Sequence, residues 1–148
     1  MLDLTVIILT YNEEIHIRRC LENVCPIAKK VIVVDSPSTD RTQEICREFD
    51  NVEVVVHKYP GNQAEQFNWA LDNLKIETEW ILRLDADEYL MPELVEELKE
   101  KLPKIDKDKV SAGGFRDNAH GWSVNTGICQ SQADYARPSV GIQEKRRL

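Results

Sequence analysis

The sequence predicts an α/β fold in which a mostly parallel sheet is flanked by helices. The first observation is that strand-like runs alternate with segments of helical periodicity four times within residues 1–110. The second is that these runs are largely aliphatic or β-branched, as in strands buried on both faces. The third is composition, since 148 residues with 42% hydrophobic and 30% charged residues fit one soluble globular domain. Strands alternating with helices build βαβ units, so the sheet is expected to be parallel with right-handed crossovers.

The first strand–helix unit occupies residues 4–24. Residues 4–9 form an aliphatic and β-branched run, which predicts a buried strand. Residues 13–24 then place apolar side chains three and four positions apart, as on one face of a helix. Pro26 ends that pattern, because proline lacks the backbone N–H that a helix interior needs.

The second unit begins with a short buried strand at residues 31–34. Residues 36–40 follow it and are rich in Ser, Pro, Thr and Asp, which are turn-forming residues. Because Thr and Asp are favoured at helix N-caps, Thr39 or Asp40 is expected to cap the next helix. The apolar face of that helix carries Ile45, Cys46 and Phe49.

The third and fourth units repeat the pattern. Residues 52–56 predict a strand, and residues 57–63 a loop centred on a Pro-Gly-Asn turn. A helix follows whose apolar face is Phe67, Ala70, Leu71 and Leu74. Residues 80–84 predict the fourth strand, and Pro92 is suited to the first position of a helix that extends to about Leu102.

The chain changes character near residue 111. The preceding residues are acidic overall, whereas the remainder is slightly basic and holds five of the six glycines. No clear period is apparent there, so we expect residues 1–115 to form one α/β unit and residues 116–148 an irregular tail. One interpretation of the abrupt change is that the tail is a shifted reading frame, which the gene sequence would decide.

Composition also excludes several classes of protein. The net charge is −7, so no basic surface supports nucleic-acid binding. No apolar run approaches the ~18 residues of a transmembrane helix, and the opening run lacks the basic flank of a secretory signal. The four cysteines form no CxxC pair and no zinc-ligand spacing. We therefore expect a cytoplasmic protein with free thiols and no transmembrane segment.

Polar clusters follow three of the predicted strands. Each alone is explained by the turn and capping residues that follow strands in any such fold. Ligands of open parallel sheets, however, bind outside the carboxyl ends of the strands, and all three clusters fall there. Together they predict a binding site. The clusters are Thr10-Tyr11-Asn12-Glu13, Asp35-Ser36-Pro37-Ser38-Thr39-Asp40 and Asp85-Ala86-Asp87-Glu88.

The third cluster predicts a metal site. Asp85 and Asp87 are two residues apart, so in extended chain both point to one side, with Cα atoms roughly 6–7 Å apart. Two such carboxylates suit Mg²⁺ or Mn²⁺, which bind few protein oxygens together with substrate phosphates. A phosphatase with an aspartate nucleophile is an alternative, but its pair would follow an early strand. No GxGxxG or GxxxxGK[ST] motif is present to hold phosphates.

Four segments resemble conserved blocks of family 2 glycosyltransferases and occur in the family's order. They are residues 6–14 (VIILTYNEE), 33–42 (VVDSPSTDRT), 66–71 (QFNWAL) and 80–88 (WILRLDADE). The resemblance covers residues 4–115. It implies a GT-A fold, incomplete on the acceptor side, a nucleotide-diphosphate sugar donor and a divalent cation, Mn²⁺ or Mg²⁺.

The same resemblance assigns roles to individual residues. Thr10, Tyr11 and Glu13 would line the nucleoside pocket, and Asp35 would hydrogen-bond the base. Asp85 would lie near the ribose and the metal, and Asp87 would coordinate the metal. The implied nucleotide-sugar site comprises Thr10, Tyr11, Glu13, Asp35, Arg83, Asp85, Ala86 and Asp87, with Asp85 and Asp87 as metal ligands.

The function implied is inverting transfer of a sugar from a UDP- or GDP-sugar to a saccharide or lipid-linked acceptor. The setting expected is cell-surface polysaccharide or lipopolysaccharide synthesis, with peripheral association at the inner face of the plasma membrane. The catalytic base should lie downstream of Asp87, but Asp117, Asp134 and Glu144 match no family context. The alternative is therefore a donor-binding fragment without the base. A sugar nucleotidyltransferase would need a basic, glycine-rich turn where Thr10–Glu13 stands.

Overall fold

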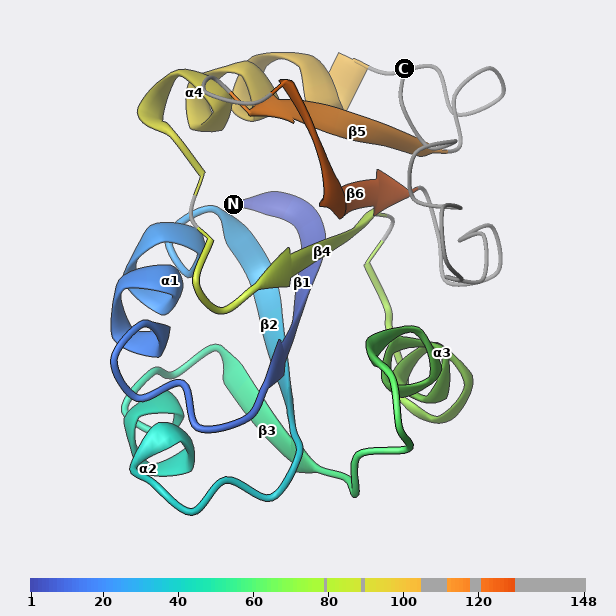
Figure 1. The fold of residues 1–148 in the computed structure, drawn as a ribbon. Helices are drawn as coiled ribbons and strands as arrows, with labels where there is room; N and C mark the ends of the chain where they lie inside the picture. Colours follow the sequence, from blue (N-terminus) through green and yellow to red (C-terminus); the bar gives the residue numbers. More distant parts are fainter. Residues whose placement is uncertain (79, 89, 105–111, 118–120, 130–148) are drawn as a thin grey trace.

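The computed structural model describes residues 1–78, 80–88, 90–104, 112–117 and 121–129. Six strands form a single sheet in the order β3-β2-β1-β4-β6-β5 (Figure 1). The strands are β1 (Leu2–Thr10), β2 (Ala28–Asp35), β3 (Val52–Val56), β4 (Trp80–Asp85), β5 (Ala112–Asp117) and β6 (Gly121–Cys129). β1, β2, β3 and β4 run parallel, as the sequence predicts.

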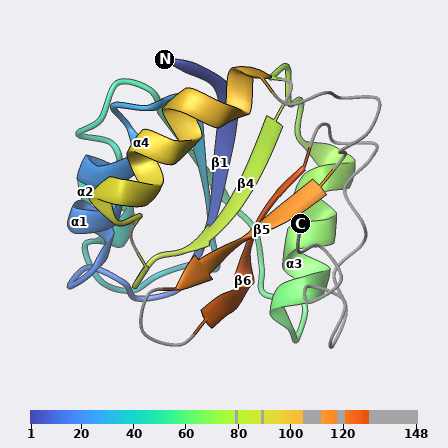
Figure 2. The same cartoon turned by 90° about the horizontal axis from the view of Figure 1, so that it is seen from above.

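Helices cover both faces of this sheet (Figures 1 and 2). They are α1 (Ile17–Val24), α2 (Thr42–Cys46), α3 (Gln63–Asn73) and α4 (Pro92–Lys101), followed by the 3₁₀ helix η1 (Leu102–Lys104). α1, α2 and α4 pack on one face, and α3 packs on the other. Among the described residues, each helix is too short or too polar to traverse a lipid bilayer.

The core has two layers because successive side chains of a strand point to opposite faces. Val6, Val33 and Leu82 belong to the layer beneath α1, α2 and α4. Ile7 and Ile81 belong to the layer beneath α3, together with Phe67 of that helix. Burial on both faces explains why the strand sequences are continuously apolar rather than alternating.

The expectation of an irregular tail from residue 116 is wrong for β6, and β5 crosses the expected boundary. β5 and β6 pair antiparallel with each other, and β6 also pairs antiparallel with β4, as in the pair Leu82↔Ile128. The sequence pattern was weak because glycines and polar residues interrupt it, although Trp122, Val124 and Ile128 fall on alternate positions. Pairing with the free edge of β4 gives hydrogen-bond partners to the backbone N–H and C=O groups, and this does not depend on the side chains. It therefore outweighs the weak strand propensity of the segment.

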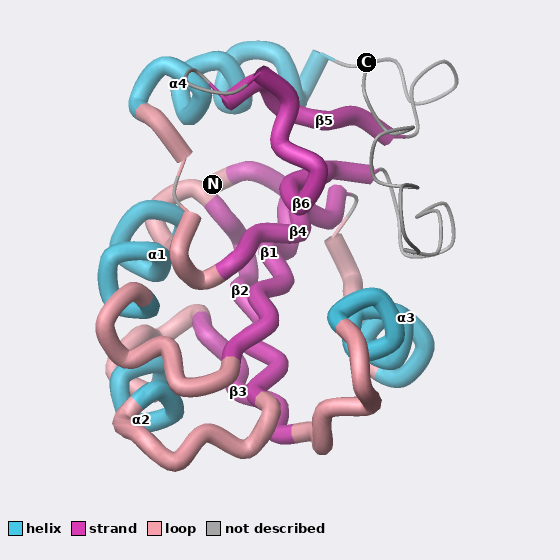
Figure 3. The backbone as a smooth tube through the Cα atoms, in the orientation of Figure 1, coloured by secondary structure: helices cyan, strands magenta, loops and turns pink. Residues whose placement is uncertain are grey.

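Two helix starts also differ from expectation. The first helix begins at Ile17 rather than near Glu13, and the intervening residues form the loop after β1 (Figure 3). α2 has Arg41 at its N-cap position, but the Oδ1 of Asp40 accepts a hydrogen bond from the Thr42 backbone N–H at 2.9 Å. Asp40 therefore satisfies a donor of the first turn from one residue farther upstream.

The Phe67→Ala substitution should lower the free energy of unfolding by about 3–5 kcal/mol, because Phe67 is fully buried beneath α3 and leaves a cavity. Urea unfolding measures the change. Glu65→Ala on the exposed side of α3 is the matched control and should remain within about 0.5 kcal/mol of the unsubstituted chain. Equal stability of the two variants would contradict the position of Phe67 in the core.

Candidate functional site

The register of the parallel strands brings the three polar clusters to one edge of the sheet. β1 is central, and its last residues align with the ends of both neighbours: Thr10 with Asp35 of β2, and Leu9 with Asp85 of β4. The three loops that begin there follow β1, β2 and β4 (Figure 3). The predicted convergence of these loops is therefore confirmed.

Asp35 lies beneath this edge and is fully buried. Its Oδ1 accepts hydrogen bonds from the hydroxyls of Thr10 at 2.6 Å and Ser38 at 2.5 Å. Its Oδ2 accepts from the Ser38 backbone N–H at 2.9 Å and from Nε2 of Gln43 at 2.7 Å. A carboxylate has about four acceptor positions, and here protein donors occupy all of them. A contact between Asp35 and a base would require Ser38, Gln43 or Thr10 to release it.

The loops after β1 and β2 are joined by reciprocal hydrogen bonds. Asn12 has a left-handed backbone (φ 51°), which asparagine tolerates better than most residues. Its backbone N–H donates to the Ser38 hydroxyl at 2.9 Å, while its Oδ1 accepts from the Thr39 N–H at 2.8 Å. The Glu13 N–H donates to the Thr42 hydroxyl at 2.9 Å. The Ser-Thr-Asp turn thus fixes the Tyr-Asn-Glu loop.

A cavity of about 400 Å³ opens between these loops and α3. Three predicted nucleoside residues, Thr10, Tyr11 and Glu13, line it. Tyr11 and Tyr59 are both largely exposed there and offer aromatic surface. The full lining is Leu9, Thr10, Tyr11, Glu13, Ser36, Pro37, Tyr59, Gln63 and Gln66.

Gln66, the first residue of the block 66–71, lines the cavity although the resemblance assigns it no individual role. It is buried on α3, its Nε2 donates to the His57 carbonyl at 3.0 Å, and its Oε1 accepts from Nδ1 of His57 at 2.7 Å. The His57 ring stacks on Trp69 with ring centroids 3.6 Å apart, so His57 has a packing role. In the sequence, Gln66 stands next to Phe67 of the apolar helix face, and a polar residue in that position indicates a buried side chain with a polar partner.

Arg83, which the resemblance includes in the nucleotide-sugar site, is buried. It is 1% exposed, and its guanidinium carbon lies 5.2 Å from the centre of the Phe67 ring. Its Nη2 donates to Oε1 of Gln63 at 3.4 Å. Because a guanidinium can only donate, the amide oxygen of Gln63 faces it and the amide nitrogen turns away. Arg83 therefore orients a residue that lines the cavity.

The loop after β4 presents its carboxylates in different environments. Burial, together with the charge of Glu88, raises the pKa of Asp85 to about 6, although Arg83 opposes the shift. Asp87 is exposed, and Ala86 is buried in the core beneath it. Oε1 of Glu88 accepts a hydrogen bond from the Asp85 N–H at 3.0 Å, so Glu88 supports the loop.

The carboxylate oxygens of this loop are suitable ligands for a hard divalent cation. Asp85 feels the negative charges of Glu88, Asp87 and Glu13, so a cation here would relieve repulsion among them. Within the part of the chain that the structure describes, no three acidic, histidine or cysteine side chains are grouped as a ready cage. Mg²⁺ and Mn²⁺ are commonly held by one or two carboxylates plus substrate phosphates, so an open pair suffices.

Other candidate residues take structural roles. His16, for which the sequence shows no partner, pairs through Nδ1 with Oε2 of Glu13 at 3.1 Å; His120 lies outside the described residues. Cys20, Cys25 and Cys46 are free thiols, as expected. Burial raises the pKa of Cys20 and Cys46 to about 12 and that of Cys25 to about 11, so none is an activated nucleophile.

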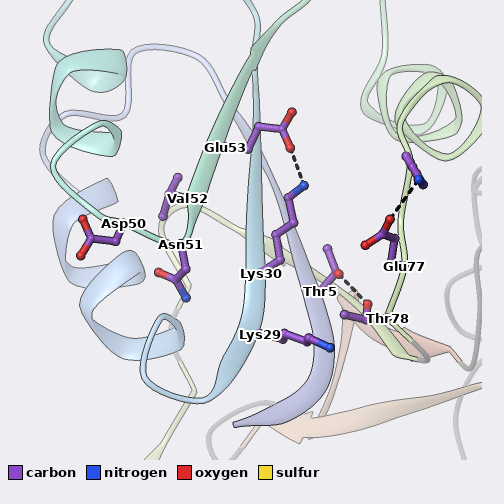
Figure 4. A pocket seen from close by; sticks show the side chains of 10 residues that line it. Thr5, Lys29, Lys30, Asp50, Asn51, Val52, Glu53, Glu77 and Thr78 are labelled. Atoms are coloured by element: carbon purple, nitrogen blue, oxygen red, sulfur yellow. Dashed lines mark hydrogen bonds and ion pairs between the residues drawn. The ribbon is translucent and has the colours of Figure 1, made fainter.

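A second cavity, of about 390 Å³, lies at the opposite edge, where β1, β2 and β3 begin (Figure 4). Two ion pairs lie among its residues: Lys30 pairs with Glu53 at 2.7 Å and Lys75 with Glu77 at 3.0 Å. Ligands of parallel sheets bind at the carboxyl edge, and the charged loops after β1, β2 and β4 are there. The cavity at the carboxyl edge is therefore the candidate site.

The sequence model of glycosyl transferase family 2 matches residues 5–137. An uncharacterized glycosyltransferase of Rickettsia bellii is 34% identical over 109 residues, covering 74% of this chain. The chain belongs to glycosyl transferase family 2. The match continues past Phe115, where the resemblance was expected to end. The chain spans only 36% of the length of that relative.

Solved structures share the fold. TarS from S. aureus superposes with a TM-score of 0.66 at 24% identity, covering 88% of this chain and 47% of that one. The mannosyltransferase PcManGT from Pyrobaculum calidifontis, in complex with GDP-Man and Mn²⁺, gives 0.67 at 21% identity, covering 86% and 44%. The GT-A fold expected from the sequence motifs is thus confirmed.

The Asp35→Asn substitution should destabilise the fold. The asparagine amide would place an N–H₂ group where a carboxylate oxygen now accepts hydrogen bonds from protein donors. Each buried donor that loses its acceptor lowers the free energy of unfolding by about 1–3 kcal/mol. Urea unfolding at neutral pH measures the loss, with the exposed Asp50→Asn as control. If both variants unfold at the same urea concentration, the Asp35 network does not hold the loops.

The raised pKa of Asp85 predicts a pH-dependent stability of the metal-free chain. Its folded pKa is about 6 against an ordinary value of 3.8, so between these pH values the folded state binds the extra proton. This contribution stabilises the fold at low pH and is lost as pH rises through 6.

Asn cannot ionise, so Asp85→Asn should gain stability relative to the unsubstituted chain as pH rises from about 4 to about 7. Urea midpoints across this range measure the gain, and the exposed Asp3→Asn should show none. A difference between Asp85→Asn and the unsubstituted chain that stays constant with pH would show that Asp85 titrates normally.

Proposed function

We propose that this chain carries the donor-binding part of a glycosyltransferase and binds a nucleoside-diphosphate sugar with a divalent cation. One observation carries the proposal: strand register sets the Asp85–Asp87 loop next to the cavity lined by Thr10, Tyr11 and Glu13. Leu9 lines that cavity and pairs with Asp85, so the two parts of the site share a strand end. Family membership gives the same reaction class.

In this proposal the cavity holds the nucleoside and the loop after β4 holds the diphosphate. Thr10, Tyr11 and Glu13 line the pocket, where Tyr11 and Tyr59 offer faces on which a base can stack. Asp35 acts on the base mainly by holding Ser38 and the loops in place, because its own oxygens are occupied. Arg83 contributes by orienting Gln63.

The cation would be held by Asp85 and Asp87, with the diphosphate completing its coordination. When bound, a divalent cation neutralises the charge that grows on the diphosphate as the sugar–phosphate bond breaks. Support for Mn²⁺ comes from related folds, since PcManGT was solved with GDP-Man and Mn²⁺ and the glucosyl-3-phosphoglycerate synthase of Mycobacterium tuberculosis with UDP and Mn²⁺. Mg²⁺ prefers the same oxygen ligands.

The reaction proposed is inverting transfer to an acceptor hydroxyl. The hydroxyl oxygen attacks the anomeric carbon, the bond to the diphosphate oxygen breaks, and a carboxylate base takes the hydroxyl proton. The base is expected downstream of Asp87; Asp117 lies in β5, while Asp134 and Glu144 lie outside the described residues. The acceptor proposed is a saccharide or lipid-linked saccharide of the cell surface, reached by peripheral association with the inner face of the membrane.

Donor binding without transfer is the alternative. It is favoured by the fact that no residue of this chain has been matched to the catalytic base. A base contributes about 10²–10⁴-fold to such a reaction, so its loss would leave binding intact while nearly abolishing transfer. Release of sugar or product from the bound donor distinguishes the two functions.

UDP- and GDP-sugars, titrated calorimetrically with and without Mn²⁺, should bind more tightly in the presence of the metal. Asp87→Ala should abolish this metal-dependent gain, because Asp87 is exposed and free to coordinate, whereas the exposed Glu93→Ala should preserve it. Binding that is independent of Mn²⁺, or equal in the Asp87 variant, would refute the metal–diphosphate site. Product formation in the same samples separates the enzyme from the binder.

A further inference from the structure

One side of α1 holds the loop that carries the candidate metal ligands. Three of its residues contact backbone atoms at the end of β4 and in the segment after it, 65 to 68 residues farther along the chain. Arg19, Cys20 and Asn23 make these contacts; Asn23 follows Cys20 by three residues and Arg19 by four, the spacings of neighbours on a helix surface.

Asn23 makes the most specific of these contacts. Its Nδ2 donates to the Leu90 carbonyl at 2.9 Å, and its Oδ1 accepts from the Leu90 N–H at 2.6 Å. One amide thus satisfies both backbone polar groups of a residue that is 3% exposed. Aspartate lacks the donor and leucine lacks both groups, so among side chains of this size only asparagine makes the pair.

Arg19 holds the same loop nearer the carboxylates. Its Nη2 donates to the backbone carbonyl of Asp87 at 3.2 Å. The Asp87 side chain is exposed, so its position is set by the backbone on either side of it rather than by packing of its own. Asp85 on one side is fixed by its place in β4, and Leu90 on the other by Asn23.

We infer that Asn23, assisted by Arg19, is a positioning residue for the Asp85–Asp87 pair and thereby sets the affinity for the metal. This inference rests on the proposed function, since it names the part of α1 that serves the same site. The reason is geometric: two carboxylates on a short loop bind a small cation well only when their spacing is held. Substituting groups that orient metal ligands typically costs 10–100-fold in metal affinity.

The test combines binding with hydrogen exchange on the full chain. Asn23→Leu keeps the side-chain size and removes both hydrogen bonds, and Asn73→Leu on the exposed part of α3 is the matched control. We expect Asn23→Leu to weaken the Mn²⁺ affinity measured with UDP by about 10–100-fold, with UDP binding in the absence of metal unchanged. Amide exchange in residues 85–90 should accelerate, while that in residues 10–14 should not. The Asn73 variant should alter none of these.

Two outcomes would overturn the inference. Unaltered Mn²⁺ affinity in Asn23→Leu, with the unsubstituted chain binding Mn²⁺ and UDP normally, refutes the positioning role and leaves the proposed function intact. Unaltered exchange in residues 85–90 refutes it independently of any metal. If the unsubstituted chain shows no metal-dependent UDP binding, the proposed function fails, and exchange still decides whether Asn23 holds the loop.

A second variant guards against a general loss of folding. Arg19 is exposed on α1, so Arg19→Met removes the contact to Asp87 without emptying the core. It should lower Mn²⁺ affinity in the same direction, with the urea midpoint little changed. An Mn²⁺ affinity in Arg19→Met equal to that of the unsubstituted chain would refute the assisting role of Arg19 and leave Asn23 as the positioning residue.

Discussion

The carboxylate of Asp35 is the interaction on which the candidate site depends. It is buried at the end of β2 and accepts from the end of β1, from the loop after β2 and from α2. A buried charge is tolerated only when its hydrogen bonds are complete, so the four donors must keep their places. The wall of the cavity is built from those same loops. Its shape is thus determined by a residue that does not line it.

The carboxyl group at the end of β4, that of Asp85, lies near other negative charges instead of a complete set of hydrogen-bond donors. The partly buried carboxyl of Asp85 lies near the negative charges of Glu88, Asp87 and Glu13, and the charge of Arg83 opposes their effect on its pKa. Asp35 is satisfied by the protein alone, whereas Asp85 keeps a need for positive charge. The two aspartates end the strands on either side of β1, yet one closes a structural network and the other leaves a site open to a ligand.

Much of the fold could be predicted because its strands are short, apolar runs separated by helical periods. The three loop clusters could be predicted too, since parallel strands present their ends together. β6 escaped prediction because the glycines and polar residues among Trp122, Val124 and Ile128 hide its alternation. The role of Asn23 could not be predicted because its partner, Leu90, belongs to another element, and no local pattern indicates that contact. The resemblance predicts that Asp35 contacts a base, whereas its burial determines that its oxygens accept from protein donors.

The pairing of β4 with β6 has a consequence for how the protein is made. β4, whose end carries the candidate metal ligands, is an interior strand only because residues 121–129 lie along its outer edge. While the chain emerges from the ribosome, β1 to β3 can assemble first and β4 joins them with one side unpaired. An apolar strand with an open edge invites pairing with other chains. The lateral edge of β4 is therefore paired late in translation, by a segment synthesised some 40 residues after the strand it protects.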